Sequence, residues 1–478
     1  MVPLGAAATL SRLTAVGGAG SAEPGNGWAL PDATGVFLFG TRLLDHGNLI
    51  SLELGTAPYT LAYDPGRNWG WASLSGTLGG HAVAAGLSLR RPESEFGRTI
   101  WGLTGWEDPY YAEDALVRDV VAAEPVAGVV VALALGAGQR VALHADYAAT
   151  RNRSQGAGQN GAGFALTTDD LHQSTGSGIA LSYGYVATEI LRSIDASVHL
   201  RARAFENKRT VFDWAGPTSY WQNELSNRGT AGSESGGLAR AEFAVGENLL
   251  ATFLAGYVTA RMDWSYDNSR TWVNDTTGAS IPPLLAFQHV VTPRATSSQT
   301  DAGTALRWNL AHATVFGGLQ FRSVHVWEND HELQVVNLGP PPYAGSAYDV
   351  DQNEHQWVLP AFAGVELRAS KAVALRFGLS HNVLSWGGGD RDGSILNANP
   401  SAPSTFRFTS HNAGASGSQT VTIAAGAGAK LGGFTLDAVT RLEFLYGSTY
   451  AMSGIPAQFA VGVSATYGFG AADAGAAR

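Results

Sequence analysis

The fold class is decided by the stretch Arg192-Ser-Ile-Asp-Ala-Ser-Val-His-Leu-Arg-Ala-Arg-Ala-Phe-Glu206. Its odd positions carry polar side chains as far as Arg203, whereas its even positions carry Ile194, Val198, Leu200 and alanines. This period of two predicts a β-strand with one wet face and one apolar face. The predicted strand is much longer than the five or six residues that are usual in soluble sheets.

The same alternation recurs in residues 434–446 and 249–266. In the second segment the even positions carry the apolar residues Leu250, Leu254, Val258, Met262 and Trp264. The odd positions carry the more polar residues Tyr257, Thr259, Arg261 and Asp263. We expect the even set to form the apolar face and the odd set to form the wet face.

Connections of two lengths alternate along the chain. Very short turns are predicted at Gly79-Gly80, Ala137-Gly138, Glu247-Asn248, Ala311-His312-Ala313, Ala369-Ser370-Lys371 and Gly432-Gly433. Long segments rich in Gly, Ser, Asn, Asp and Pro separate them and predict loops near 92–125, 151–176, 207–235, 267–300, 330–354 and 387–417. Short turns at one end and long loops at the other are typical of outer-membrane barrels. The sequence therefore predicts an all-β fold, a transmembrane antiparallel β-barrel of about 16 strands, with 14 to 18 possible.

Composition excludes several other classes. The chain has 478 residues, of which 60 are Gly, and it has no Cys, so disulfides, thiolate metal sites and a cysteine nucleophile are excluded. A net charge of −10 argues against nucleic acid as a partner. We expect residues 1–22 to be a possible signal or leader and 23–47 a periplasmic or lumenal N-terminal segment. The barrel is expected at 48–469 and a C-terminal tail at 470–478.

The last predicted strand, Gln458-Phe-Ala-Val-Gly-Val-Ser-Ala-Thr-Tyr-Gly-Phe469, resembles the C-terminal strand of Gram-negative outer-membrane β-barrel proteins. The resemblance implies that Tyr467 and Phe469 form an assembly signal for the barrel-assembly machinery. Chain length is similar to that of porins and, more loosely, of long-chain fatty-acid transporters. The Asn-Pro-Ala hatch motif of those transporters is missing, because Leu30-Pro31-Asp32-Ala33 stands in roughly that region.

Enzymatic and metal-binding signals are weak. No Gly-x-Ser-x-Gly nucleophile motif exists, and we predict that the chain is not an enzyme. Asp349, Asp351 and Asn353 have the alternate spacing of oxygen ligands at the start of a calcium loop, although Glu354 stands where such a loop needs glycine. Calcium is therefore a weak candidate, and no other cofactor is expected.

Arginines dominate the predicted lumen wall. Alternation assigns these residues to the lumen: Arg140, His144, Asp195, His199, Arg201, Arg203, Arg240, Arg261, Arg307, Arg376 and Arg441. Paired with carboxylates, arginines brace a barrel wall, and unpaired they favour anions. Only Ser380 and Asn382 accompany Arg376 as polar residues on its own strand face, so we expect it to be the unpaired cation.

These patterns predict a porin-like channel in the bacterial outer membrane for passive diffusion of small polar or anionic solutes. The alternatives are a transporter for hydrophobic substrates with an N-terminal hatch in the lumen, and a barrel that scaffolds a partner such as an electron-transfer cytochrome. Expected partners are the lipid bilayer and lipopolysaccharide, the barrel-assembly machinery, small solutes and, in an oligomer, further copies of the chain.

Overall fold

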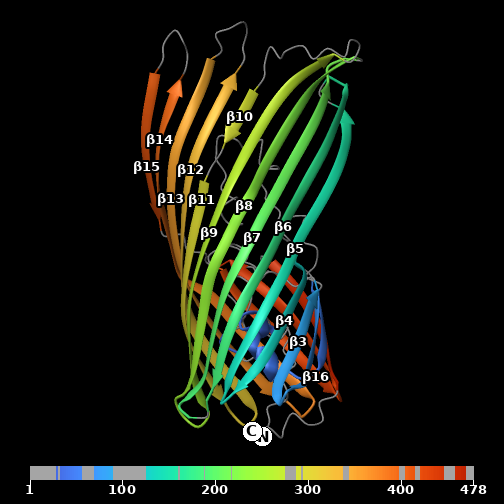
Figure 1. Cartoon of the computed structure of the whole chain (residues 1–478), viewed down its shortest axis with the longest axis vertical. Coiled ribbons are helices and arrows are strands. Elements are labelled where there is room, and N and C mark those ends of the chain that lie inside the picture. The colour runs from blue at the N-terminus through green and yellow to red at the C-terminus, as the bar shows by residue number, and fades with distance from the viewer. Residues whose placement is uncertain are drawn as a thin grey trace.

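The chain forms one antiparallel sheet that closes on itself (Figure 1). The structure is a computed structural model that describes residues 28–30, 33–55, 69–89, 125–159, 162–187, 189–216, 218–274, 287–291, 294–336, 344–397, 404–414, 420–445 and 458–469. Strands that are consecutive in sequence pair with each other, and β1 pairs with both β2 and β18. Closure leaves no sheet edge at this level, which a sheet spanning a lipid bilayer requires.

The wall consists of sixteen strands in the described part of the chain, as the sequence predicted. The strand segments are β1 (Leu49–Gly55), β2 (Trp69–Leu78), β3 (His81–Leu89), β4 (Pro125–Gly136), β5 (Gln139–Gln159), β6 (Ala165–Val186), β7 (Leu191–Trp214), β8 (Ser219–Ala244), β9 (Leu249–Asn274), β10 (Phe287–Val291), β11 (Arg294–Asn309), β12 (Ala313–Val336), β13 (Ala344–Arg368), β14 (Val373–Asn397), β15 (Ser404–Gly414), β16 (Thr420–Leu431), β17 (Phe434–Leu445) and β18 (Gln458–Gly468). Segments β10 and β11 both pair with β9 and β12, one after the other, so they are parts of one strand. Segments β15 and β16 follow each other along β14 in the same way.

Tight turns join the strands at one end of the barrel, which we call the turn end. Between β2 and β3, Gly79 and Gly80 have φ angles of +59° and +84°. Two consecutive positive φ angles are the geometry of a two-residue hairpin turn that glycine adopts without steric cost. The predicted turns therefore lie where the sequence placed them.

Long loops were predicted at the other end, and the structure corrects most of them. Segments β5 to β9 have 21 to 26 residues each, so most of residues 151–176, 207–235 and 267–274 are strand. The same holds for much of 330–354 and 387–417. These extensions are polar on both faces, so composition did not distinguish them from loops. They rise beyond the shorter strands β1 to β4 and β16 to β18 (Figure 1). The predicted loop near 92–125 lies almost wholly outside the described residues.

The outer surface of the barrel is apolar and its inner surface is mainly polar. On β7 the outward Leu200 is 59% exposed, whereas the inward Asp195 is 3% exposed. Other outward positions, such as Leu52, Val131, Phe377 and Val463, are also exposed apolar residues. Such a belt around a closed barrel is the lipid-facing surface of a transmembrane barrel.

Segment β9 reverses the predicted faces. Leu254, Val258 and Met262 are buried on the inside, whereas Tyr257 is 53% exposed on the outside. Arg261 shares the face of Tyr257, so its assignment to the lumen was wrong. The reason is that an apolar segment of the chain covers the inner wall beside β9. The apolar face of β9 therefore contacts this segment inside the barrel and not lipid.

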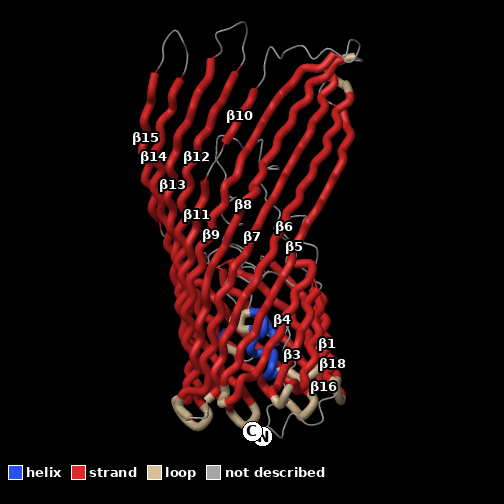
Figure 2. Tube along the Cα trace, in the orientation of Figure 1, coloured by secondary structure: helices blue, strands red, loops and turns tan. Residues whose placement is uncertain are grey.

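The covering chain is the N-terminal segment. Residues 28–30 and 33–48, here called the hatch, include the 3₁₀ helices η2 (Ala33–Phe37) and η3 (Gly40–Asp45). Both helices lie inside the barrel in its half nearer the turn end (Figure 2). No helix in the described part of the chain is long and apolar enough to span a membrane.

Candidate functional site: the hatch and the lumen wall

One end of the hatch is anchored by Trp28. Its Nε1–H donates a hydrogen bond to Oε1 of Gln320 at 3.0 Å, and its ring meets the edge of Phe362 at a centroid distance of 5.9 Å. A Cβ at Gly303 would lie 2.8 Å from Cζ2 of Trp28, so only glycine leaves room for the indole. Trp28, Leu30 and Phe39 form one buried cluster with the inward apolar residues of β8 to β13.

A second apolar cluster holds the other side of the hatch. Phe37 lies edge-on to Trp69 and Trp71 at 5.8 and 5.9 Å, and its ring is 6.4 Å from that of His144. Leu43 is fully buried against the wall formed by β2 to β5. The hatch therefore packs against opposite parts of the barrel wall.

Charged residues fix the middle of the hatch to β7. Arg42 donates from Nε to Oδ2 of Asp195 at 3.0 Å and from Nη2 to Oγ of Ser193 at 2.9 Å. Asp45, on the same helix, pairs with Arg42 at 3.4 Å and with Arg140 of β5. Burial by itself would lower the pKa of Arg42, but the charges of Asp195 and Asp45 outweigh it and raise the pKa. Arg42 therefore remains a cation inside the barrel.

The pairing continues along the wall beside the hatch. Arg240 lies directly opposite Asp195 on β8. Glu242 accepts hydrogen bonds from Arg240 at 3.3 Å and from Arg307 at 3.1 Å. These groups are nearly buried, so their opposite charges compensate one another in place of solvation by water.

Further from the turn end, a smaller group surrounds the buried carboxylate of Glu234. His199 Nε2 lies 3.1 Å from Oε1 of Glu234, and Arg201 lies 3.4 Å from the same oxygen. Arg201 is also 3.8 Å from Asp146. Arg203 is buried one step farther along the same face of β7. The positive residues predicted on this strand are thus largely engaged by carboxylates.

Arg376 is not the unpaired cation that the sequence suggested. It donates to Glu366 at 2.7 Å and to Asp437, and it is nearly buried. Glu366 lies on the neighbouring strand β13, and Asp437 lies on β17, one strand beyond β16, whereas the prediction considered polar residues on the same strand as Arg376. Arg441 occupies a position of β17 between Ala424 and Ala460, and its side chain lies outside the described residues.

The weak calcium candidate lies on strand β13 and not in a loop. Asp349, Asp351 and Asn353 are alternate strand residues, about 6.6 Å apart along the chain, which is too far for one ion to bind all three. Asp351 accepts a hydrogen bond from Asn329, and Asn353 contacts His325. Within the described residues, no group of three acidic or histidine side chains could hold a metal ion.

The C-terminal aromatic residues lie on the outer surface at the turn end. Tyr467 contacts the ring of Phe434 at 4.4 Å and stacks on Phe469 at 6.2 Å. Phe469 directly follows β18 and donates its backbone N–H to Asn48. The predicted leader 1–22 and tail 470–478 lie outside the described residues.

Comparisons with known proteins found matches among solved structures. No known protein family and no curated protein matches the sequence. Among solved structures, the monoaromatic hydrocarbon channel CymD is 13% identical and covers 96% of this chain and 98% of its own, with a TM-score of 0.36. The Pseudomonas putida toluene transporter TodX is 10% identical and covers 97% and 98%, also with a TM-score of 0.36. The translocator domain of autotransporter NalP from Neisseria meningitidis is 14% identical and covers 70% and 89%, with a TM-score of 0.24.

This chain has the fold of outer-membrane β-barrels. The closed sheet and the apolar belt around it establish this. The activities of those structures are properties of those proteins. That this chain is not an enzyme stays a prediction.

Sequence reasoning missed the hatch contacts. Arg42, Asp45 and Trp28 were not singled out, although the stretch Val36-Phe-Leu-Phe-Gly-Thr-Arg-Leu-Leu44 is strongly apolar and contains one cation. A short apolar segment just before the first strand was the available signal.

Proposed function

We propose that this protein is a bacterial outer-membrane transporter in which the hatch controls the passage of small molecules with apolar surface. The observation that supports this proposal is the packing of Trp28, Phe37 and Leu43 across the lumen. An open diffusion channel needs a continuous water-filled path, and a chain segment in the lumen narrows that path. We assign the turn end to the periplasm, as in other barrels with short turns there.

Apolar residues beyond the hatch support the proposed substrate class. Phe205, Leu225 and Met262 are buried on the inner face, farther from the turn end than the Trp28 cluster. In a barrel that carries only polar solutes, such positions are normally polar. The hatch and these residues together favour the hydrophobic-substrate alternative over the open porin.

A porin-like channel for polar or anionic solutes is the second candidate. The arginine-rich wall favours it, because Arg201 and Arg203 line the inner face. A scaffold for a cytochrome stays a prediction, as do the lipid, lipopolysaccharide and assembly-machinery partners.

A disulfide between hatch and wall tests the proposal. A Cβ at Gly184 of β6 would lie 3.1 Å from Cβ of Thr41, slightly closer than the 3.5–4.5 Å of native disulfides, so a small shift suffices. The chain has no other cysteine to interfere. We expect the Thr41→Cys/Gly184→Cys protein to show few channel openings in planar bilayers when oxidised and more openings when reduced.

The single variants Thr41→Cys and Gly184→Cys are the controls, and heat-modifiable gel mobility reports an intact barrel. A steady current of equal size in the oxidised and reduced proteins, or no current in the reduced protein, contradicts hatch control.

A further inference from the structure

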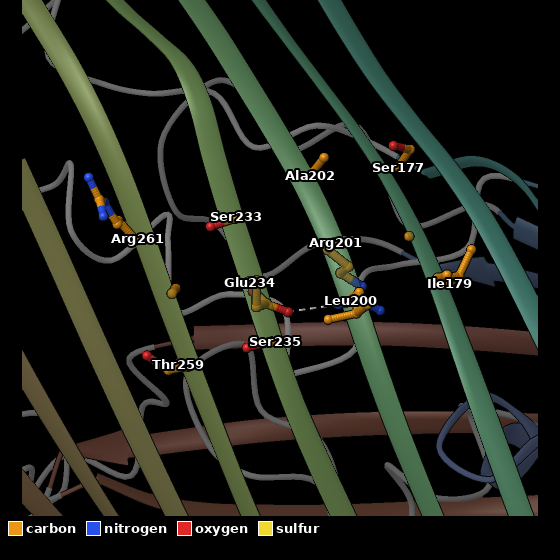
Figure 3. A pocket seen from close by; sticks show the side chains of 12 residues that line it. Ser177, Ile179, Leu200, Arg201, Ala202, Ser233, Glu234, Ser235, Thr259 and Arg261 are labelled. Carbon is orange, nitrogen blue, oxygen red and sulfur yellow. Dashed lines mark hydrogen bonds and ion pairs between the residues drawn. The ribbon is translucent and has the colours of Figure 1, made fainter.

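The outer wall over β6 to β9 contains a depression of about 550 Å³ (Figure 3). Ser177, Ala202, Ser233 and Arg261 stand side by side across the four segments and line it. Their side chains point outward, because Arg261 shares the outward face of β9. Three neighbouring lipid-side positions thus carry small side chains, and this leaves the hollow.

The depression lies where the apolar belt ends. On the side toward the turn end it is bounded by Ile179 and Leu200, which are 54% and 59% exposed. Ser235 and Thr259 occupy the same row as these two residues and add hydroxyl groups. The side chain of Arg261 is 50% exposed and bounds the other side. The hollow therefore offers an apolar surface and hydroxyls side by side in one row, and a guanidinium in the next row, farther from the turn end.

Three more cations stand on the outward face farther from the turn end. Arg151, Lys208 and Arg228 are exposed. Arg151 and Arg228 lie in one row with Gln173 and Glu206 between them, and Lys208 is two residues beyond Glu206. Within the part of the chain that the structure describes, none of these three cations makes an ion pair shorter than 4 Å, although the charge of Lys208 attracts Asp169.

Carboxylates on the same surface make other contacts, although Gln173 is uncharged and does not neutralise Glu206. Glu206 accepts a hydrogen bond from Gln173 at 2.6 Å, and Asp169 is held by Arg153. Asp263 lies 3.4 Å from Arg261, a long contact between half-exposed groups that a stronger anion can displace. The row of Arg151, Gln173, Glu206 and Arg228 holds two arginines and one glutamate, so it has an excess of positive charge that attracts an anion.

We propose that this depression binds a phosphorylated glycolipid of the outer leaflet, namely the lipid A part of lipopolysaccharide. An acyl chain lies on Ile179 and Leu200, the sugar meets the serine and threonine hydroxyls, and phosphates pair with Arg261 and Arg228. An arginine guanidinium can bind two oxygens of one phosphate at the same time. A phosphate at the membrane surface has a charge opposite to that of arginines at the same depth in the membrane. The site is on the outer wall and does not depend on whether the hatch moves.

Binding of diphosphoryl lipid A to the detergent-purified protein, measured by native mass spectrometry, tests the proposal. Arg261→Ala and Arg228→Ala should each weaken binding of lipid A about tenfold, because the loss of one hydrogen bond between charged groups lowers the affinity by about that factor. Ser233→Leu should also weaken it by filling the hollow, whereas Arg407→Ala, an exposed cation on β15, should not.

Dephosphorylated lipid A and inorganic pyrophosphate distinguish the source of the anion. We expect weak binding of the first and no displacement of lipid A by the second at equal concentration. Unchanged lipid A binding by Arg261→Ala and Arg228→Ala overturns the proposal, as does displacement by pyrophosphate, which would indicate a site for free anions. Partial rescue by Arg261→Lys would show that charge, and not a folding defect, explains the loss.

Discussion

Arg42 of the hatch and Asp195 of β7 are joined by a hydrogen bond of 3.0 Å from Nε to Oδ2. Ser193, two residues before Asp195 on the same inward face, accepts from Nη2 of Arg42. One arginine thus contacts two successive inward positions of a single strand. This contact sets where the hatch lies along the barrel axis.

Replacing Arg42 should loosen the hatch. Arg42→Ala leaves Asp195 nearly buried without its closest cation, and breaking a buried ion pair costs about 3 kcal/mol. We expect more frequent channel openings in planar bilayers and faster protease cleavage within the hatch. Arg153→Ala, which breaks an exposed pair with Asp169, is the matched control and should change neither measurement. An unchanged hatch in Arg42→Ala would mean that the apolar clusters alone hold it.

Gly303 should be intolerant of a side chain because of Trp28. A Cβ there would lie 2.8 Å from the indole, and overpacking of this kind costs about 1–3 kcal/mol. Gly303→Leu should therefore displace Trp28 and expose the hatch to protease while the barrel still migrates as folded. Gly76→Leu is the control, since a Cβ at Gly76 meets no atom within 4 Å. Equal protection of the hatch in both variants would contradict the packing of Trp28.

Arg376→Glu should damage the barrel rather than tune ion selectivity. The substitution places a third carboxylate beside Glu366 and Asp437, both of which now pair with Arg376. Removal of the cation alone costs about 3–5 kcal/mol at a buried site. We expect a lower yield of folded protein and a lower temperature of conversion in heat-modifiable gels. Arg407→Glu makes the same change of charge at an exposed site and should fold normally; normal folding of Arg376→Glu as well would contradict the pairing.

The aromatic end of β18 should matter more than the tail beyond it. Phe469→Ala removes the stacking on Tyr467, a contact of about 1 kcal/mol, and alters the predicted assembly signal. We expect slower assembly in the variant, followed as the appearance of the heat-modifiable band. Deletion of residues 470–478 should leave the assembly rate unchanged. If the deletion is the slower of the two, the resemblance to the assembly signal does not extend to Phe469.

Sequence and structure agree where one face of a strand touches lipid and the other does not. On β7 the alternation from Ser193 to Arg203 correctly placed every polar side chain on one face, because lipid and lumen are chemically opposite. Beyond the belt this contrast disappears. Residues 207–214 are strand with polar groups on both faces, and no period of two remains to be detected.

By itself, the sequence determined the closed barrel, its sixteen strands and its tight turns, because these follow from local alternation and from glycine chemistry. Only the tertiary structure decided which carboxylates neutralise Arg376, since Glu366 lies on the adjacent strand β13 and Asp437 lies two strands away on β17. It also decided that Val258 and Met262 face inward and Arg261 outward. The hatch is the physical reason, because the part of the inner wall that it contacts is apolar. Alternation in the sequence shows that the two faces of a strand differ in polarity, but it does not show which face is inside the barrel.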